Sequence, residues 1–152
     1  MRDVTLCFLR KDNHICLAMK KRGFGVGKLN GVGGKVENTE TIEDAAVREI
    51  EEEIGVQVRK KHLQKIGTLQ FSFENKDDWG QLCHVYFVEI WRGEPVETEE
   101  MAPSWHHKNE IPFSDMWVDD PLWLPQALEY KKIEATFHFN EDGSNILKYK
   151  VQ

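Results

Sequence analysis

Four charged residues close together carry the clearest chemical signal in the sequence. Arg48 precedes Glu49, and Glu52 and Glu53 follow three and four positions after Glu49. On a helix the three carboxylates are neighbours, and like charges at this spacing destabilise it by about 0.2–0.5 kcal/mol per pair. A hard cation bound between them would reverse that repulsion, and Mg²⁺ is commonly shared between carboxylates and substrate phosphates. The spacing therefore indicates either a metal site for phosphate chemistry or a solvated acidic face.

The same stretch predicts the helix that must hold these side chains. Thr41 followed by Asp44 is typical of a helix N-terminus, where acidic residues also interact favourably with the helix dipole. Gly55 is expected to end the helix, because glycine adopts the left-handed conformation of a C-terminal cap without strain. Apolar residues recur between them at helical spacing and predict one buried face, formed by Ile42, Ala45, Ala46 and Ile50.

Negative charge is concentrated in this stretch. The chain has 152 residues and a formal charge of -6, and residues 34–56 contain eight acidic and two basic residues. The remainder of the chain is therefore balanced in charge. This distribution argues against a broad basic surface for polymeric nucleic acid, but it allows a nucleotide whose phosphates arrive with a divalent cation.

The rest of the chain alternates short apolar runs with polar turns. Strands are predicted at residues 4–9, 15–19, 57–58, 65–73, 83–91, 135–139 and 146–151. A second helix is predicted at residues 121–132, and residues 92–110 are expected to form a polar loop. This order of elements predicts one α+β domain over residues 1–152, built as a helix–sheet–helix sandwich.

The acidic helix lies within a longer pattern, G-x5-E-x7-R-E-U-x-E-E-x-G-U, in which U is an aliphatic residue. The chain matches every specified position, at Gly34, Glu40, Arg48, Glu49, Ile50, Glu52, Glu53, Gly55 and Val56. This pattern resembles the Nudix box, whose family hydrolyses a nucleoside diphosphate linked to another group. The resemblance implies a Nudix-type α/β/α sandwich with a mixed central sheet and two main helices.

Residues 112–120, PFSDMWVDD, combine an indole with two adjacent carboxylates. In a partly desolvated pocket Asp119 and Asp120 cannot both ionise easily, so the pKa of one should rise. A protonated carboxyl donates a hydrogen bond while its neighbour accepts one, and together they can read a purine edge. Trp117 can stack on the base. The alternative is a surface turn in which an aspartate caps the following helix.

Further short sequence strings, spread over most of the chain, resemble one particular group within this family. MKKRGFG at 19–25, NG-x-GGKV at 30–36 and IPF-x-DMW-x-DD at 111–120 are similar to the animal-type MutT homologues, the oxidised purine nucleoside triphosphatases (8-oxo-dGTP diphosphatases). Departures occur at Leu29 and Val32, where that family usually has aromatic residues, and in the loop at 75–82. They bear on base preference rather than on the chemistry.

The resemblance implies roles for individual residues. It implies that Glu53 orients or deprotonates the attacking water, that Arg48 orients the glutamates, and that Glu40 supports the loop or helix start. The metal ligands it implies are the Gly33 carbonyl, Glu49, Glu52, Glu53 and Glu100, and the catalytic residues are Glu53, Glu52, Glu49 and Arg48. The substrate-binding residues it implies are Thr5, Lys20, Phe24, Asn30, Gly34, Lys35, Phe71, Phe73, Trp117, Asp119 and Asp120.

The expected activity is Mg²⁺-dependent hydrolysis, with Mn²⁺ as an alternative ion, of nucleotides such as 8-oxo-dGTP and 2-hydroxy-dATP to the monophosphate and pyrophosphate. Two other functions remain open. One is a Nudix hydrolase of a dinucleoside polyphosphate, nucleotide sugar or ordinary dNTP, and the other is a non-catalytic nucleotide-binding module. The expected partner is a small nucleotide, with no nucleic-acid polymer and no membrane. Cys7, Cys16 and Cys83 fit buried free thiols in a reducing compartment, so we expect a cytoplasmic protein. A monomer is the default expectation.

Overall fold

One mixed sheet organises the chain. The computed structural model describes residues 1–152, and seven strands follow the order β3-β2-β1-β5-β4-β7-β8, with β6 paired to β2. The β1–β5 and β4–β7 pairs are parallel, whereas the other pairs are antiparallel. The strands are β1 (Arg2–Lys11), β2 (His14–Lys20), β3 (Leu29–Asn30), β4 (Leu63–Phe73), β5 (Gln81–Val88), β6 (Met101–His107), β7 (Ile133–Phe139) and β8 (Ile146–Val151).

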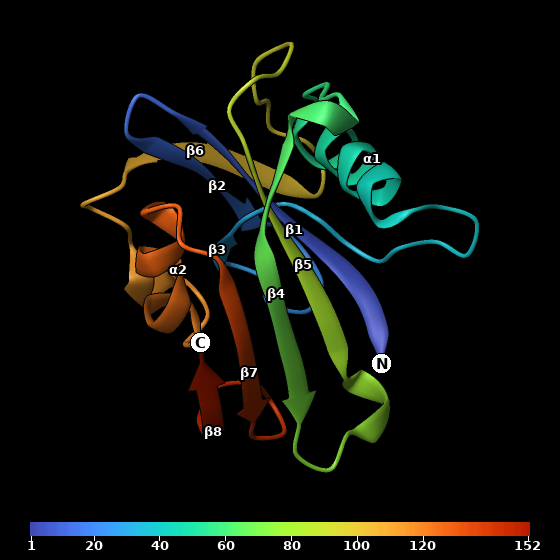
Figure 1. The fold of residues 1–152 in the computed structure, drawn as a ribbon, viewed down its shortest axis with the longest axis vertical. Helices are drawn as coiled ribbons and strands as arrows, with labels where there is room; N and C mark the ends of the chain where they lie inside the picture. The colour runs from blue at the N-terminus through green and yellow to red at the C-terminus, as the bar shows by residue number, and fades with distance from the viewer.

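Two α-helices, α1 (Ile42–Ile54) and α2 (Asp120–Leu128), cover opposite sides of the sheet (Figure 1). Successive residues of β1 point to opposite faces, so Cys7 packs in the core under α1 while Phe8 packs against Trp123 of α2. This is the predicted α/β/α sandwich. Three short 3-10 helices complete the chain, at Lys60–His62, Asp77–Trp79 and Phe113–Asp115. None of the helices has the length and apolar character needed to cross a bilayer.

The predicted polar loop at 92–110 is wrong in its second half, because β6 lies there. This strand pairs with β2 alone, so it is an edge strand, and an edge tolerates the proline and polar side chains that hid it from sequence patterning. The predicted strand at 83–91 ends earlier, at Val88. Residues 57–58 form only an isolated bridge, between Gln57 and Arg92, rather than a strand.

The second predicted helix also ends early, at Leu128 rather than at residue 132. The chain leaves the helix at Tyr130, which has a positive φ of 62°. The N–H groups of Tyr130 and Lys131 donate to the carbonyls of Ala127 and Gln126, which is the hydrogen-bond pattern of a Schellman C-cap. Glycine usually occupies this position, so the tyrosine gave no stop signal.

A glycine in β4 allows the parallel pairing with β7. A Cβ on Gly67 would lie 1.8 Å from the Ile133 carbonyl oxygen, whereas a Cβ on Gly80 would have no neighbour nearer than 3.5 Å. Gly67→Ala should therefore force the two strands apart and lower the free energy of unfolding by about 1–3 kcal/mol. Urea denaturation measures this change. Gly80→Ala is the matched control and should stay within about 0.5 kcal/mol of the wild type; equal losses in both variants would contradict the assignment.

Candidate active site

Helix α1 begins and ends where its sequence predicts. Thr41 is the N-cap, and its Oγ1 accepts a hydrogen bond from the Asp44 backbone N–H at 3.1 Å. Gly55 closes the helix with a φ of 72°, and its N–H donates to the Glu51 carbonyl. With its apolar face buried against the sheet, α1 presents its row of glutamates to the loop that precedes the helix.

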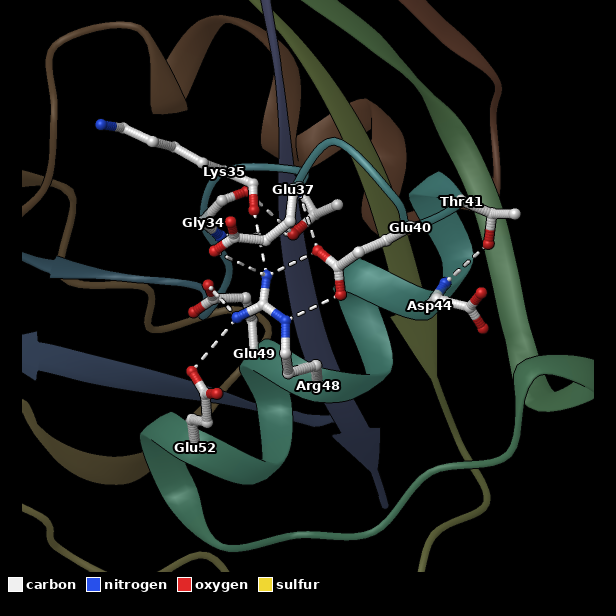
Figure 2. Close-up of polar contacts among 10 residues, drawn as sticks. Gly34, Lys35, Glu37, Glu40, Thr41, Asp44, Arg48, Glu49 and Glu52 are labelled. Atoms are coloured by element: carbon white, nitrogen blue, oxygen red, sulfur yellow. Dashed lines mark hydrogen bonds and ion pairs between the residues drawn. The ribbon is translucent and has the colours of Figure 1, made fainter.

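Arg48 gathers the carboxylates of this region (Figure 2). Its Nε and Nη2 each donate to Glu40 at 2.8 Å, and its Nη1 donates to Glu49 at 2.9 Å and to Glu52 at 3.2 Å. Its Nη2 also reaches the Lys35 carbonyl at 3.2 Å. The bidentate pair with Arg48 lowers the pKa of Glu40 to about 2. The guanidinium therefore ties the preceding loop to α1 and offsets part of the repulsion among the glutamates.

Two glycines bring that loop against β1 and α1. A Cβ on Gly33 would lie 1.9 Å from the Thr5 carbonyl oxygen, and one on Gly34 would lie 2.7 Å from the Glu49 carboxylate. The Gly34 N–H donates to Thr5 Oγ1 at 3.2 Å, and the Gly33 N–H donates to Glu53 Oε1 at 2.8 Å. Larger residues would hold the loop away from the glutamates.

Among the glutamates Glu49, Glu52 and Glu53 of α1, Glu49 and Glu53 are the more buried. Only 7% of Glu53 is exposed, and burial, with a further contribution from the charge of Glu49, raises its pKa to about 7 despite the hydrogen bond from Gly33. Burial also raises the pKa of Glu49, against the opposing effect of Arg48. Both carboxylates therefore lie where an ionised group is costly without a cation.

The donor set fits a hard divalent cation. Helix α1 has no basic residue in its last turn, where its dipole disfavours the glutamates, and the Gly33 carbonyl accepts no hydrogen bond. Carboxylate and carbonyl oxygens are the ligands that Mg²⁺ and Mn²⁺ take. No group of three or more His, Cys, Asp or Glu side chains is already arranged to hold a metal ion. Glu49 and Glu52 face Arg48 instead, and Glu53 faces the Gly33 N–H.

Glu100 lies near the acidic helix but is held by another residue. Its carboxylate accepts a hydrogen bond from Arg22 Nε at 3.1 Å, and the contact with Arg22 lowers its pKa. The charges of Glu100 and Lys20 both act on the pKa of Glu53, in opposite directions. Lys20 and Glu100 therefore face the same region as Glu53, although neither contacts it.

An aromatic cluster forms the second half of the candidate site. The rings of Trp117 and Phe24 are stacked, with centroids 5.1 Å apart and an interplanar angle of 28°. Trp79 packs edge-on against Phe24 at 5.5 Å and against Phe73 at 5.8 Å. Phe73 in turn stacks on Phe139 at 5.2 Å. These rings, contributed by five separate segments, form one continuous apolar wall.

Two members of this wall were not predicted. Trp79 lies in the polar loop before β5, and a tryptophan in such a loop was the available signal. Phe139 alternates with Phe137 along β7, so the two share one face of the strand. Phe71, which was predicted, joins the wall through these two phenylalanines, at 5.7 Å and 6.0 Å.

The loop of residues 23–28 covers Trp117. Gly25 has a φ of 84°, and a Cβ there would lie 2.9 Å from the indole. Lys28 Nζ lies 5.1 Å from the indole centroid, and its positive charge lowers the pKa of Asp120 against the effect of burial. Phe24 therefore occupies one face of Trp117 in this structure.

Asp119 and Asp120 are buried at the start of α2, with 4% and 2% exposed. Asp119 Oδ2 accepts from the Trp123 indole N–H at 2.9 Å, and Asp120 Oδ2 accepts from the Trp117 backbone N–H at 3.1 Å. Burial raises the pKa of Asp119 to about 6, and burial with the charge of Asp119 raises that of Asp120 well above its usual value. Asp119 does occupy the N-cap position of α2 after a turn, as the alternative expects, but it is buried rather than at the surface and its side chain makes no capping hydrogen bond.

Three predicted substrate-binding residues belong neither to the glutamates of α1 nor to the aromatic wall. Thr5 contacts the backbone of Gly34 rather than the aromatic wall. Asn30 lies in β3, and its Oδ1 accepts from the adjacent Gly31 N–H at 2.8 Å. Lys35 is exposed, and its side chain points away from Arg48 (Figure 2).

Comparison with known proteins defines the class. The sequence profile of the NUDIX domain family matches residues 1–127. The chain is 41% identical to the mouse (Mus musculus) "Oxidized purine nucleoside triphosphate hydrolase", over 99% of this chain and 94% of that protein. It is 44% identical to the zebrafish (Danio rerio) protein of the same name, over 90% of this chain and 85% of that protein. A MutT protein from Bacillus halodurans has the same fold, with a TM-score of 0.87, 24% identity and coverage of 100% of this chain and 98% of that chain.

The chain therefore belongs to the NUDIX family, as its box predicted, and it is a Nudix hydrolase. Members of this family generally use divalent metal ions.

The buried aspartate pair predicts a pH dependence of stability. The pKa of Asp119 is about 6 in the folded protein, above its usual value, so the wild type loses stability as pH rises from about 4 to 6. Asp119→Asn cannot ionise and retains an acceptor for Trp123. Relative to the wild type, the variant should gain about 1–3 kcal/mol between pH 4 and pH 8.

Urea unfolding at pH 4 and pH 8 measures this gain. Asp115→Asn, at an exposed position nearby, is the control and should show no such trend. A gain for Asp119→Asn that is the same at both pH values would show that burial does not raise the Asp119 pKa.

Proposed function

We propose that this protein hydrolyses oxidised purine nucleoside triphosphates, of the 8-oxo-dGTP and 2-hydroxy-dATP type, to the nucleoside monophosphate and pyrophosphate. Such an activity would remove damaged precursors from the nucleotide pool. The observation that carries the proposal is the buried Asp119–Asp120 pair beside Trp117, in a chain that also has a complete Nudix box. The names of the mouse and zebrafish relatives, both oxidized purine nucleoside triphosphate hydrolases, support it.

The aspartate pair suits an oxidised purine because such a base combines donors and acceptors along one edge. The pKa of both carboxyls is raised, so the pair retains a proton more readily than exposed aspartates do. One carboxyl then donates a hydrogen bond to the base while the other accepts one. Trp117 supplies a stacking surface, and the phenylalanines of the wall exclude water from that contact.

The acidic face of α1 is the proposed phosphate-processing half. Glu49, Glu52 and Glu53, with the Gly33 carbonyl and Glu100, would hold Mg²⁺, which neutralises charge developing on the phosphoryl oxygens and lowers the pKa of bound water. To bind the ion, the carboxylates of Glu49 and Glu52 would have to rotate away from Arg48, to which they are hydrogen-bonded. Arg48 would still keep both carboxylates close to the ion. Lys20 adds a positive charge in the same region.

Glu53 is the proposed proton acceptor. It would take a proton from the attacking water, whose oxygen bonds to phosphorus while the α–β phosphoanhydride bond breaks and pyrophosphate leaves. The Gly33 N–H fixes one of its oxygens at 2.8 Å, so the carboxylate has a defined orientation. Glu40 and Arg48 would act indirectly, because their hydrogen bonds fix the loop that carries Gly33 and Gly34.

We further propose that the protein acts as a monomer in the cytoplasm. All three cysteines are buried and unpaired, which suits a reducing compartment.

Glu53→Gln should lower kcat by about 10²–10⁴-fold, because the amide cannot accept the proton. It should leave the thermal unfolding midpoint nearly unchanged, since its oxygen can still accept from Gly33. Steady-state kinetics on 8-oxo-dGTP measures the effect. Glu51→Gln, at an exposed position of the same helix, is the control and should retain wild-type kcat. A Glu53→Gln enzyme with near-normal kcat would remove Glu53 from this role.

Pyrophosphate release across a substrate panel tests the proposed specificity. The panel comprises 8-oxo-dGTP, 2-hydroxy-dATP, dGTP, dATP, ADP-ribose and diadenosine tetraphosphate, with phosphate-containing products of the last two assayed separately. We expect kcat/KM to favour an oxidised purine over its parent by at least about tenfold, which equals 1.4 kcal/mol of discrimination. A different leading substrate would retain the Nudix chemistry and reject the base assignment. No turnover of any compound would favour a nucleotide-binding module.

The role of the aspartate pair has its own test. Asp119→Ala should reduce kcat/KM for the oxidised purine by at least about tenfold more than for diadenosine tetraphosphate, because it removes a base contact and not a phosphate contact. Equal losses on both substrates would show that the pair does not read the base.

A further inference from the structure

Arg10 is a buried cation that no carboxylate neutralises. It lies at the end of β1, where only 7% of the residue is exposed, and it takes part in none of the ion pairs of the molecule. Its Nη2 donates to the Leu128 carbonyl, but its Nη1 has no hydrogen-bond partner. No other buried side-chain nitrogen or oxygen atom of the protein lacks a partner. Burying a guanidinium in this way is costly, since paired donors are the rule for buried polar groups.

Tyr130 covers this guanidinium from a strained backbone position. Its ring centroid lies 4.2 Å from Arg10 Cζ, and Phe87 lies on the guanidinium at 5.2 Å. Tyr130, the residue after the C-cap of α2, has a φ of 62°, a conformation that costs a residue with a Cβ roughly 1–2 kcal/mol. Its hydroxyl donates to Glu89 at 3.1 Å, yet the side chain remains largely exposed. Strain of this kind concentrates at functional sites.

A cavity of about 390 Å³ opens beside these two residues. The chain segments around it are the β1–β2 turn, the residue after β5, the residue after β6 and the end of α2. Its lining comprises Arg10, Lys11, Asp12, Asn13, Glu89, Lys108, Leu128, Glu129 and Tyr130. None of these residues belongs to the acidic helix, the aromatic wall or the buried aspartate pair, so this cavity is separate from the candidate active site.

We propose that this cavity is a second ligand site, which binds a small molecule through a single oxyanion, a carboxylate or a phosphate, on the guanidinium of Arg10. Arginine presents a planar set of donors that matches both groups, and a charge-assisted bond to Nη1 would satisfy the one donor that the fold leaves unpaired. The exposed ring of Tyr130 moves aside when the ligand enters, and its departure from the guanidinium gives the oxyanion access to Nη1.

The charges around the cavity restrict the ligand further. Lys11 and Lys108 add positive charge at the rim, while Asp12, Glu89 and Glu129 add negative charge. The three cations and three carboxylates of the lining balance, so the net charge of the cavity adds no attraction for a ligand with several negative charges. Binding therefore depends on the single unpaired donor of Arg10, which suits a small ligand with one oxyanion better than a nucleoside triphosphate.

Titration of the wild-type protein with sodium acetate and, separately, with sodium phosphate tests the proposal. Arginine side-chain and backbone signals are followed by ¹⁵N NMR at constant ionic strength, with sodium chloride as the reference salt. We expect a saturable shift of the Arg10 Nε–H signal and of the Lys11 and Tyr130 amides, absent with chloride. The salt with the lower dissociation constant identifies a carboxylate or a phosphate as the preferred group. Absence of a saturable shift with either salt would overturn the proposal.

Matched variants locate the binding. Arg10→Lys keeps the positive charge but loses the planar donors, and Arg10→Met keeps only an apolar stem. Both should bind the preferred anion at least about tenfold more weakly, as expected for loss of a charge-assisted hydrogen bond. Arg92→Met removes an exposed arginine outside the cavity and should bind like the wild type. Unchanged binding by folded Arg10 variants, or an equal loss in Arg92→Met, would also overturn the assignment.

Discussion

The four-way contact of Arg48 is the interaction on which the acidic half of the candidate site depends. One guanidinium holds Glu40 with two hydrogen bonds, contacts Glu49 and Glu52, and reaches the carbonyl of Lys35. Without it, a row of glutamates near the C-terminal end of α1 would repel one another and would be opposed by the helix dipole. The same contact fixes the loop whose glycines meet Glu49 and Glu53. Charge compensation and loop placement are therefore achieved by a single side chain.

The two halves of the candidate site have opposite electrostatic requirements. At α1, the proposed role of the glutamates as metal ligands requires them to be ionised, and Arg48 compensates part of their charge. At the start of α2, burial raises the pKa of both Asp119 and Asp120 and so favours their protonated forms, and neither carboxylate takes part in an ion pair. Alternation of side chains along β1, exemplified by Cys7 and Phe8, provides each helix with its own core. One sheet therefore supports two groups of carboxylates that lie in different electrostatic surroundings.

Local features of this structure could be predicted from the sequence, whereas features that depend on distant pairing could not. Helix α1 was predicted with its caps because Thr41 and Gly55 act within a few residues of themselves. Strand β6 was missed because its identity as a strand comes from pairing with β2. Trp79 was missed for a similar reason, since its place in the aromatic wall is set by contacts with Phe24 and Phe73. The spacing of the charged residues indicated the chemistry through its resemblance to the Nudix box, whereas only the fold could show which distant rings meet.

Phe24 stacks on Trp117 and so occupies an indole face on which a nucleotide base could stack. Any nucleotide that uses this face must first replace an intramolecular aromatic contact, so its apparent affinity falls in proportion to the fraction of molecules in which the indole is free. The penalty is the same for every base, because it is incurred before the base is read. Under the proposed function, ordinary purine nucleotides would gain little from the aspartate pair and would be held too weakly to occupy the site, while an oxidised base would recover the loss through hydrogen bonds. The cost of displacing Phe24 would then limit occupation of the site by abundant, undamaged nucleotides.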